Sequence, residues 1–136
     1  MLLLDTHALI WIVAKAPMSP ASLAAVRGAA RAGEVLVSPV SAWEIGLLAT
    51  ARTSGITFLP TPRRWLQQAL STPGVRLTPL LPEAALEAAF LPGKLHRDPA
   101  DRLLVASARQ LGATIITRDA QILAYARQGH VDAIPC

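Results

Sequence analysis

Met1-Leu2-Leu3-Leu4-Asp5-Thr6-His7-Ala8 opens the chain, and this stretch decides which fold the remainder can adopt. Its apolar run carries no charge and no turn former, and it stops at Asp5. A short, uninterrupted run of this kind is typical of a central strand in a parallel sheet, which is covered on both faces. Asp5 would then lie at the carboxyl end of the strand, where open α/β sheets bind their ligands. A carboxylate at this place can equally be an N-cap for a helix over Ala8 to Ala14, and both interpretations stay open.

The rest of the chain alternates between apolar runs and helix-forming stretches. Further strands are expected at 34–38, 75–77, 113–116 and 131–134. Helices are expected to follow Ser19-Pro20, to begin near Ser41, and to follow Thr61-Pro62, Leu81-Pro82, Asp98-Pro99 and Asp119. Strands that alternate with helices require right-handed crossovers and a mostly parallel sheet with helices on both sides. We therefore predict one domain over residues 1–136, of the α/β class, with three layers in the order α/β/α.

Two of these helices carry specific expectations about their side chains. Ser41 followed three residues later by Glu44 fits a capping box, which would occupy the Glu44 carboxylate at the start of a helix. In the helix expected at 82–90, Leu86 and Phe90 should face the core.

Composition excludes several classes of protein. Hydrophobic residues make up 52% of the 136 residues and charged residues 16%, which excludes a disordered chain. No apolar stretch reaches the roughly 18 residues that a membrane span needs. The first residues lack the basic start of a signal peptide, so we expect a cytoplasmic protein. Cys136 is the only cysteine, and a single thiol forms neither an internal disulfide nor a cysteine-based zinc site.

The charges of the chain are unevenly distributed among residue types. Thirteen basic residues, of which eleven are arginine, face nine acidic ones, and the net charge is +4. If five of the nine acids gather in one pocket, thirteen positive and four negative charges remain elsewhere, a balance of +9. Such a surface favours polyanions such as nucleic acid. A coding bias toward arginine explains the same count equally well, so charge alone does not decide the partner.

Five acidic residues occupy equivalent places in the predicted pattern. Asp5 and Asp119 directly follow strands, whereas Glu44, Asp98 and Asp101 lie in or just before the first turn of a helix. All these places fall on the carboxyl edge of a doubly wound sheet. Carboxylates that meet there raise one another's pKa, and a divalent cation removes that cost. Oxygen ligands without cysteine suit Mg²⁺, with Mn²⁺ as a substitute, and basic surroundings then suggest metal-assisted hydrolysis of a nucleic acid.

The same residues resemble a known family, the PIN domain, and most of all its VapC-type toxins from bacterial toxin–antitoxin pairs. The resemblance rests on four motifs in matching order and spacing, each of them weak alone, and it covers nearly the whole chain. These motifs are Leu4-Asp5-Thr6-His7, Ser41-Ala42-Trp43-Glu44-Ile45, His96-Arg97-Asp98-Pro99-Ala100-Asp101-Arg102-Leu103-Leu104 and Thr117-Arg118-Asp119. One departure is Ala100, where many relatives of this subgroup carry Phe.

The resemblance implies a Mg²⁺-dependent endoribonuclease, usually a homodimer, that a VapB-type antitoxin holds inactive. Asp5, Glu44, Asp101 and Asp119 match the family's acidic quartet, which would bind the ion and catalyse the cleavage of RNA. Asp98 matches an additional acid of the subgroup and can share metal binding with helix capping. Supporting roles fall to the hydroxyl groups of Thr117 and Thr6.

Four basic side chains near these motifs are candidates for contact with RNA: His7, His96, Arg97 and Arg102. Arg102 can instead form an ion pair with a neighbouring carboxylate and shape the pocket. A receiver domain is a poor alternative because it requires paired acids after the first strand and a lysine after the fifth. A second alternative is a PIN fold that binds RNA or protein without cutting.

Overall fold

Five short strands form one parallel sheet in the computed structural model, which describes residues 1–136. The strands are β1 (Leu2–Leu4), β2 (Val35–Val37), β3 (Val75–Leu77), β4 (Thr114–Thr117) and β5 (Asp132–Pro135), in the spatial order β3-β2-β1-β4-β5. In register, Leu4 of β1 lies between Val37 of β2 and Ile116 of β4. The N-terminal run is therefore the central strand, and every pairing in the sheet is parallel.

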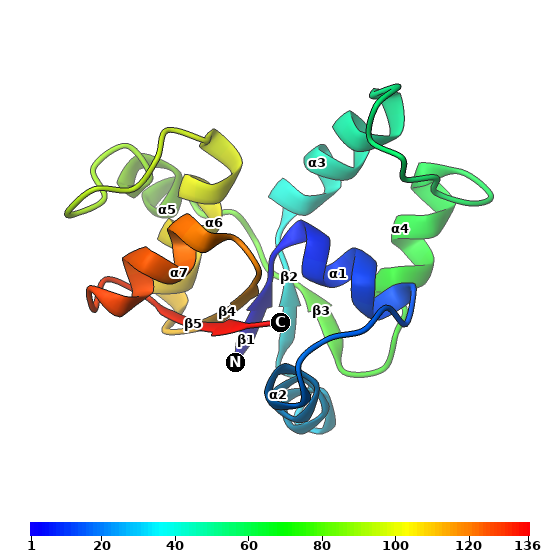
Figure 1. Ribbon diagram of the computed structural model, residues 1–136, viewed down its shortest axis with the longest axis horizontal. Helices are drawn as coiled ribbons and strands as arrows, with labels where there is room; N and C mark the ends of the chain where they lie inside the picture. Colours follow the sequence, from blue (N-terminus) through cyan, green and yellow to red (C-terminus); the bar gives the residue numbers. More distant parts are fainter.

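Helices cover both faces of this sheet, which confirms the predicted α/β fold with three layers (Figure 1). On one side lie α1 (Thr6–Val13), α2 (Pro20–Arg31) and α4 (Pro62–Leu70), and on the other lie α5 (Pro82–Glu87), α6 (Pro99–Leu111) and α7 (Ala120–Arg127). The remaining helix, α3 (Pro39–Thr50), follows β2 at the carboxyl edge and contacts helices of both layers. None of these helices is long and apolar enough to cross a membrane.

Alternate side chains of the strands pack into two separate cores. Leu3, Leu36 and Ile115 are almost completely buried and pack toward α6 and α7. Their neighbours Leu4 and Ile116 point to the opposite face, where they join the apolar residues of α1, α2 and α4. Because both faces are covered, every residue of the central strand is apolar, as the first residues of the sequence indicated.

The start of α3 contradicts one prediction. The N-cap is Ser38, whose hydroxyl accepts a hydrogen bond from the amide of Val40 at 3.1 Å, and Pro39 is the first helical residue. Ser41 therefore lies inside the helix, and the predicted capping box with Glu44 is wrong. The physical reason is that proline has no N–H and a fixed φ, which suit the first helical position. The Glu44 carboxylate is consequently not used to cap its own helix.

The short helix α5 contradicts a second prediction. Leu86 and Phe90 were expected inside, but they are 67% and 75% exposed, and the helix ends at Glu87. Ala84 and Ala88 face the core instead. Small side chains let α5 pack directly against α6, so the larger apolar residues of the same stretch are turned toward solvent.

The order of the strands places a crevice at a defined point of the sheet. The chain leaves β1 toward β2 and β3 on one side, and then returns to the other side of β1 as β4. In open parallel sheets such a switch point opens a crevice at the carboxyl ends of the strands. Asp5 directly follows β1, and Asp119 follows β4, so both lie beside this crevice.

Candidate metal centre

A pocket of about 270 Å³ lies at the carboxyl edge of the sheet. The five acidic residues that the sequence places at this edge all line it, although they come from four separate segments of the chain, with Asp98 and Asp101 both at the start of α6. The complete lining is Asp5, Thr6, His7, Trp11, Glu44, Asp98, Asp101, Leu104, Arg118 and Asp119. Residues up to 114 positions apart in sequence therefore share one small space, which the parallel strands and the helices that follow them create.

Three of the five acids are N-caps of helices that begin at the pocket. Asp5 Oδ1 accepts a hydrogen bond from the amide of Ala8 at 2.6 Å, at the start of α1. Asp98 Oδ1 accepts from the amide of Asp101 at 3.0 Å, at the start of α6. Asp119 Oδ1 accepts from two amides of the first turn of α7, each at 2.8 Å. In every case the backbone of the helix bonds Oδ1 alone, so capping does not consume the whole carboxylate.

Glu44 is held by residues of two different helices. The hydroxyl of Thr6, on α1, donates to Glu44 Oε1 at 2.6 Å, and Thr6 Oγ1 also lies 3.0 Å from Ser41 Oγ on α3. Thr6 and Ser41 are both buried, so this contact fixes the place at which α3 meets α1. Burial raises the pKa of the Glu44 carboxyl, the bond from Thr6 opposes that shift, and the charge of Asp101 adds to it.

Thr117 connects the two acids at the ends of the central strands. It is fully buried, and its Oγ1 accepts a hydrogen bond from the amide of Asp119 at 2.9 Å. Burial raises the pKa of the Asp5 carboxyl, and side-chain hydrogen bonding to Thr117 lowers it in part. Asp5 is only 8% exposed, so its ionised form carries a desolvation cost that these bonds do not fully offset.

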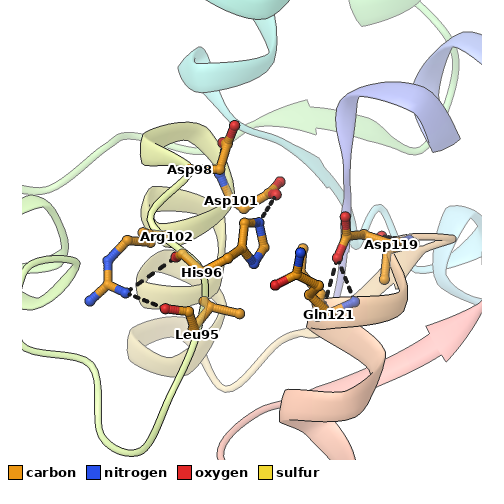
Figure 2. Close-up of polar contacts among 9 residues, drawn as sticks. Leu95, His96, Asp98, Asp101, Arg102, Asp119 and Gln121 are labelled. Carbon is orange, nitrogen blue, oxygen red and sulfur yellow. Dashed lines mark hydrogen bonds and ion pairs between the residues drawn. The ribbon is translucent and has the colours of Figure 1, made fainter.

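His96, in the loop before α6, contacts Asp101 in the first turn of that helix. The distance between His96 Nε2 and Asp101 Oδ2 is 2.6 Å, and both side chains are half-buried (Figure 2). Burial raises the pKa of the Asp101 carboxyl, the hydrogen bond from His96 opposes that shift, and the charges of Asp98 and Asp119 add to it. The sequence suggested His96 as a residue for contact with RNA, whereas the structure gives its ring a carboxylate partner.

The other basic candidates lie differently from one another. His7 is exposed at the rim of the pocket with its ring beside Trp11, at 5.7 Å between centroids. Arg97 is exposed and does not line the pocket. Arg102 forms no ion pair with a carboxylate, so that alternative is wrong. Its guanidinium is turned away from the acids and donates to the carbonyls of Leu95 and His96 (Figure 2). It also donates to the carbonyl of Ala88.

Two residues of the pocket were missed in the sequence. Arg118 is stacked on the Trp11 ring, with 4.0 Å from its guanidinium carbon to the ring centroid. It also donates to the carbonyls of Pro17 and Cys136, at 2.6 and 2.7 Å, which anchors a positive charge beside the acids. The sequence contained a signal that could have placed both residues at the pocket. Arg118 stands between the motif residues Thr117 and Asp119, and Trp11 follows His7 by one helical turn, so it lies on the same face of the helix.

The donor set fits a hard divalent cation. Carboxylate oxygens dominate the pocket, no thiol lines it, and burial, together with the charges of neighbouring carboxylates, raises the pKa of three of its acids. Ligand atoms of His96, Asp101 and Asp119 lie within 4.8 Å of one another. Two oxygens on opposite sides of Mg²⁺ are separated by about 4.2 Å, so an ion fits between such groups with little rearrangement.

Known proteins resemble the chain in sequence and in structure. The sequence profile of the PIN domain matches residues 2–128. Ribonuclease VapC22 of Mycobacterium tuberculosis (strain ATCC 25618 / H37Rv) is 32% identical over 120 residues, which make up 88% of each chain. The crystal structure of VapBC2 from Rickettsia felis bound to a promoter DNA fragment contains a similar fold, with a TM-score of 0.70, 14% identity and coverage of 98% of this chain and 97% of that chain. The crystal structure of DNA-bound VapBC from Salmonella typhimurium also contains a similar fold, with a TM-score of 0.66, 14% identity and coverage of 98% of this chain and 96% of that chain.

Proposed function

Because this chain belongs to the PIN-domain family, we propose that it is a metal-dependent endoribonuclease that acts as the toxin of a toxin–antitoxin pair. The observation that carries the proposal is the meeting of five carboxylates in one pocket at the switch point of the sheet. The relative named as a ribonuclease aligns with 88% of this chain and supports RNA as the substrate. The proposed metal is Mg²⁺, with Mn²⁺ as a substitute.

Each acidic residue has a proposed part in this site. Asp5 and Asp101 would contact the ion most directly, because Asp5 directly follows the central strand and Asp101 stands in the first turn of α6. Glu44 and Asp119 would bind it directly or through water. Asp98 would contribute to metal binding while it also caps α6. Thr6 and Thr117 hold Glu44, Asp5 and Asp119 in place through their hydroxyl groups. The chemistry that the ion supplies is activation of water and neutralisation of charge on the phosphodiester.

Cationic groups around the pocket suit a phosphate backbone. Arg118 lines the pocket and is fixed by two carbonyls and an aromatic ring, so it would bind a phosphate there without a large loss of side-chain entropy. His7 lies exposed on the same rim, and Arg97 is exposed on the loop before α6. These three side chains are the proposed contacts with RNA.

Cleavage of RNA by the purified protein tests the proposal. We expect cleavage with Mg²⁺ or Mn²⁺, none with EDTA, and a loss of about 100-fold or more in Asp5→Asn, since outer-shell partners alone cost 10- to 100-fold. Asp132→Asn is the matched control, because Asp132 is an exposed aspartate on β5, outside the pocket. Cleavage that persists unchanged in Asp5→Asn and Asp101→Asn would identify a contaminating nuclease. Metal binding without cleavage would favour the alternative, a PIN fold that binds RNA or protein.

The proposed partners are a VapB-type antitoxin and a second copy of the chain, and the proposed location is the cytoplasm. Support for the antitoxin comes from the similarity of fold to chains in VapBC assemblies. Co-expression with the product of an adjacent short reading frame should yield a stable complex and suppress cleavage. Induced expression of the chain alone should arrest growth, and the Asp5→Asn form should not. Light scattering of the purified chain measures whether it is a dimer.

A further inference from the structure

We propose that His96 is a positioning residue: it donates a hydrogen bond to one oxygen of Asp101, leaves the other oxygen as a single ligand, and so favours Mg²⁺ over Ca²⁺. The inference rests on the metal-dependent function proposed above and concerns the selectivity of the same site. It assigns to His96 a part that differs from contact with RNA.

The position of the proton on the imidazole follows from its surroundings. His96 Nε2 lies 2.6 Å from Asp101 Oδ2, whereas His96 Nδ1 is buried and has no hydrogen-bond partner. A neutral imidazole carries its proton on one nitrogen only. With the proton on Nε2, Asp101 accepts it and Nδ1 remains a bare acceptor. With the proton on Nδ1, a buried N–H would have no acceptor, and two lone pairs would face each other at 2.6 Å. The geometry therefore places the proton on Nε2.

The same proton excludes His96 as a direct ligand. One of its ring nitrogens lies within 4.8 Å of ligand atoms of Asp101 and Asp119, so distance alone would permit coordination. A histidine that binds a metal through Nε2 carries its proton on Nδ1, and in metal sites that N–H is almost always bonded to an acceptor. His96 Nδ1 has none, so its ring supports Asp101 instead of replacing it.

The backbone of His96 is fixed as well as its ring. Arg102 Nη1 donates to the carbonyl of Leu95 at 3.0 Å and to that of His96 at 3.4 Å (Figure 2). Its Nε donates to the carbonyl of Ala88 at 2.7 Å. Arg102 follows Asp101 on α6. One helix therefore carries both the carboxylate and the guanidinium that holds the loop opposite it, so the distance between His96 and Asp101 is set by α6.

The consequence for the ion concerns the number of oxygens that Asp101 can offer. Mg²⁺ requires near-octahedral coordination and takes one oxygen from each carboxylate, whereas Ca²⁺ accepts six to eight ligands and often binds both oxygens of one carboxylate. Because the N–H of His96 occupies one lone pair of Asp101 Oδ2 and fixes the plane of the carboxylate, Oδ1 is the freer oxygen and binding through both oxygens is disfavoured. This arrangement suits Mg²⁺, and release of Oδ2 would improve the site for Ca²⁺ relative to Mg²⁺.

Two amide substitutions separate the hydrogen bond from the shape of the side chain. The Nε2 of glutamine reaches the place of the histidine Nε2, whereas the shorter asparagine does not. Calorimetric titration with MgCl₂, CaCl₂ and MnCl₂ should show that His96→Asn weakens Mg²⁺ binding by about 10- to 100-fold. Because Ca²⁺ binding should fall less, the preference for Mg²⁺ should drop by about tenfold in that variant. His96→Gln should keep the wild-type preference, as should His130→Gln, whose ring packs on Tyr125 outside the pocket.

Each other outcome overturns a defined part of the reasoning. An unchanged Mg²⁺/Ca²⁺ ratio in His96→Asn overturns the positioning role and leaves the proposed function intact. Loss of Mn²⁺ binding in both His96→Asn and His96→Gln would make the ring a direct ligand. A wild-type protein that binds neither Mg²⁺ nor Ca²⁺ would overturn the proposed function and this inference together. Nitrogen-15 NMR of wild-type His96 needs no variant: a protonated Nε2 is expected, and a protonated Nδ1 would contradict the assignment.

Discussion

Replacement of Arg102 by lysine tests whether this side chain acts through its charge or through its shape. The sequence allowed an ion pair, which lysine would preserve. In the structure Arg102 instead bonds three carbonyls, two of them in the loop before α6 and the third at the end of α5. Only a planar guanidinium has N–H groups in a fixed fork that spans such acceptors, and a single ammonium cannot span them. We therefore expect Arg102→Lys to destabilise the fold although the charge is kept.

The size of the effect follows from the bonds that lysine cannot make. Nε and Nη1 each make one short bond, to Ala88 at 2.7 Å and to Leu95 at 3.0 Å, and the longer contact with His96 shares Nη1. Hydrogen bonds to a charged group contribute about 1.5–3 kcal/mol each. Lysine can replace one of the two, so Arg102→Lys should lose about 2 kcal/mol of unfolding free energy, and Arg102→Met about 4 kcal/mol. For a chain of this length the Lys variant should melt about 8 °C lower.

Urea unfolding followed by tryptophan fluorescence measures these differences. Arg97→Lys serves as the control, because Arg97 is exposed and a surface exchange of this kind changes stability by less than about 0.5 kcal/mol. If Arg102→Lys is as stable as the wild type while Arg102→Met is not, charge alone is sufficient and the clamp is refuted. If both variants lose the same amount, lysine replaces neither bond, and the estimate that it keeps one of the two is refuted.

Three further predictions concern metal, pH and surface. Mg²⁺ at 100 times its dissociation constant should add about 2.7 kcal/mol to the unfolding free energy, and this gain should vanish in Asp5→Asn but not in Asp132→Asn. Burial raises the pKa of the Asp101 carboxyl, so the folded protein binds its proton more tightly than the unfolded chain does. This proton stabilises the fold fully below the ordinary carboxyl pKa of about 4, and the contribution is lost as the pH rises through the raised pKa. Metal-free Asp101→Asn should therefore be more stable than the wild type at neutral pH, and a gap that does not shrink toward pH 4 contradicts this. Phe90→Gln should change stability by less than about 0.5 kcal/mol in urea, because Phe90 is 75% exposed, whereas Leu3→Ala should cost about 2–5 kcal/mol.

Local chemistry was enough to predict most elements of the fold. Prolines preceded by a capping residue mark the starts of α2, α4 and α6, where Ser19, Thr61 and Asp98 accept the expected amide hydrogen bonds. The apolar run at the N-terminus indicated a central strand, because only a strand covered on both faces tolerates such a sequence. These signals act over a few residues, so one sequence contains them in full.

The predictions failed where two local sequence signals pointed to different structures, or where a side chain contacts residues outside its own helix. At α3, the spacing of Ser41 and Glu44 suggested a capping box, whereas Ser38 was assigned to the preceding strand; the proline rule that held elsewhere favours Ser38, which is the cap in the structure. In α5, apolar spacing did not reveal that alanines would take the buried positions. The pairing of His96 with Asp101 depends on the path of an irregular loop, which has no periodicity to read. The orientation of Arg102 depends on the same loop.

The sequence presented each acid as either a helix cap or a metal ligand, and the structure shows why the two are compatible. The amides of α1, α6 and α7 bond Oδ1 of Asp5, Asp98 and Asp119, so a cap uses part of a carboxylate and holds the rest in place. The start of each helix also carries about half a positive charge, which moderates the repulsion among the acids. The pKa of the Asp5 carboxyl is nevertheless raised, chiefly by burial and in smaller part by the charge of Asp119. A cation that enters the pocket thus meets ordered oxygens and uncompensated negative charge, and both favour its binding.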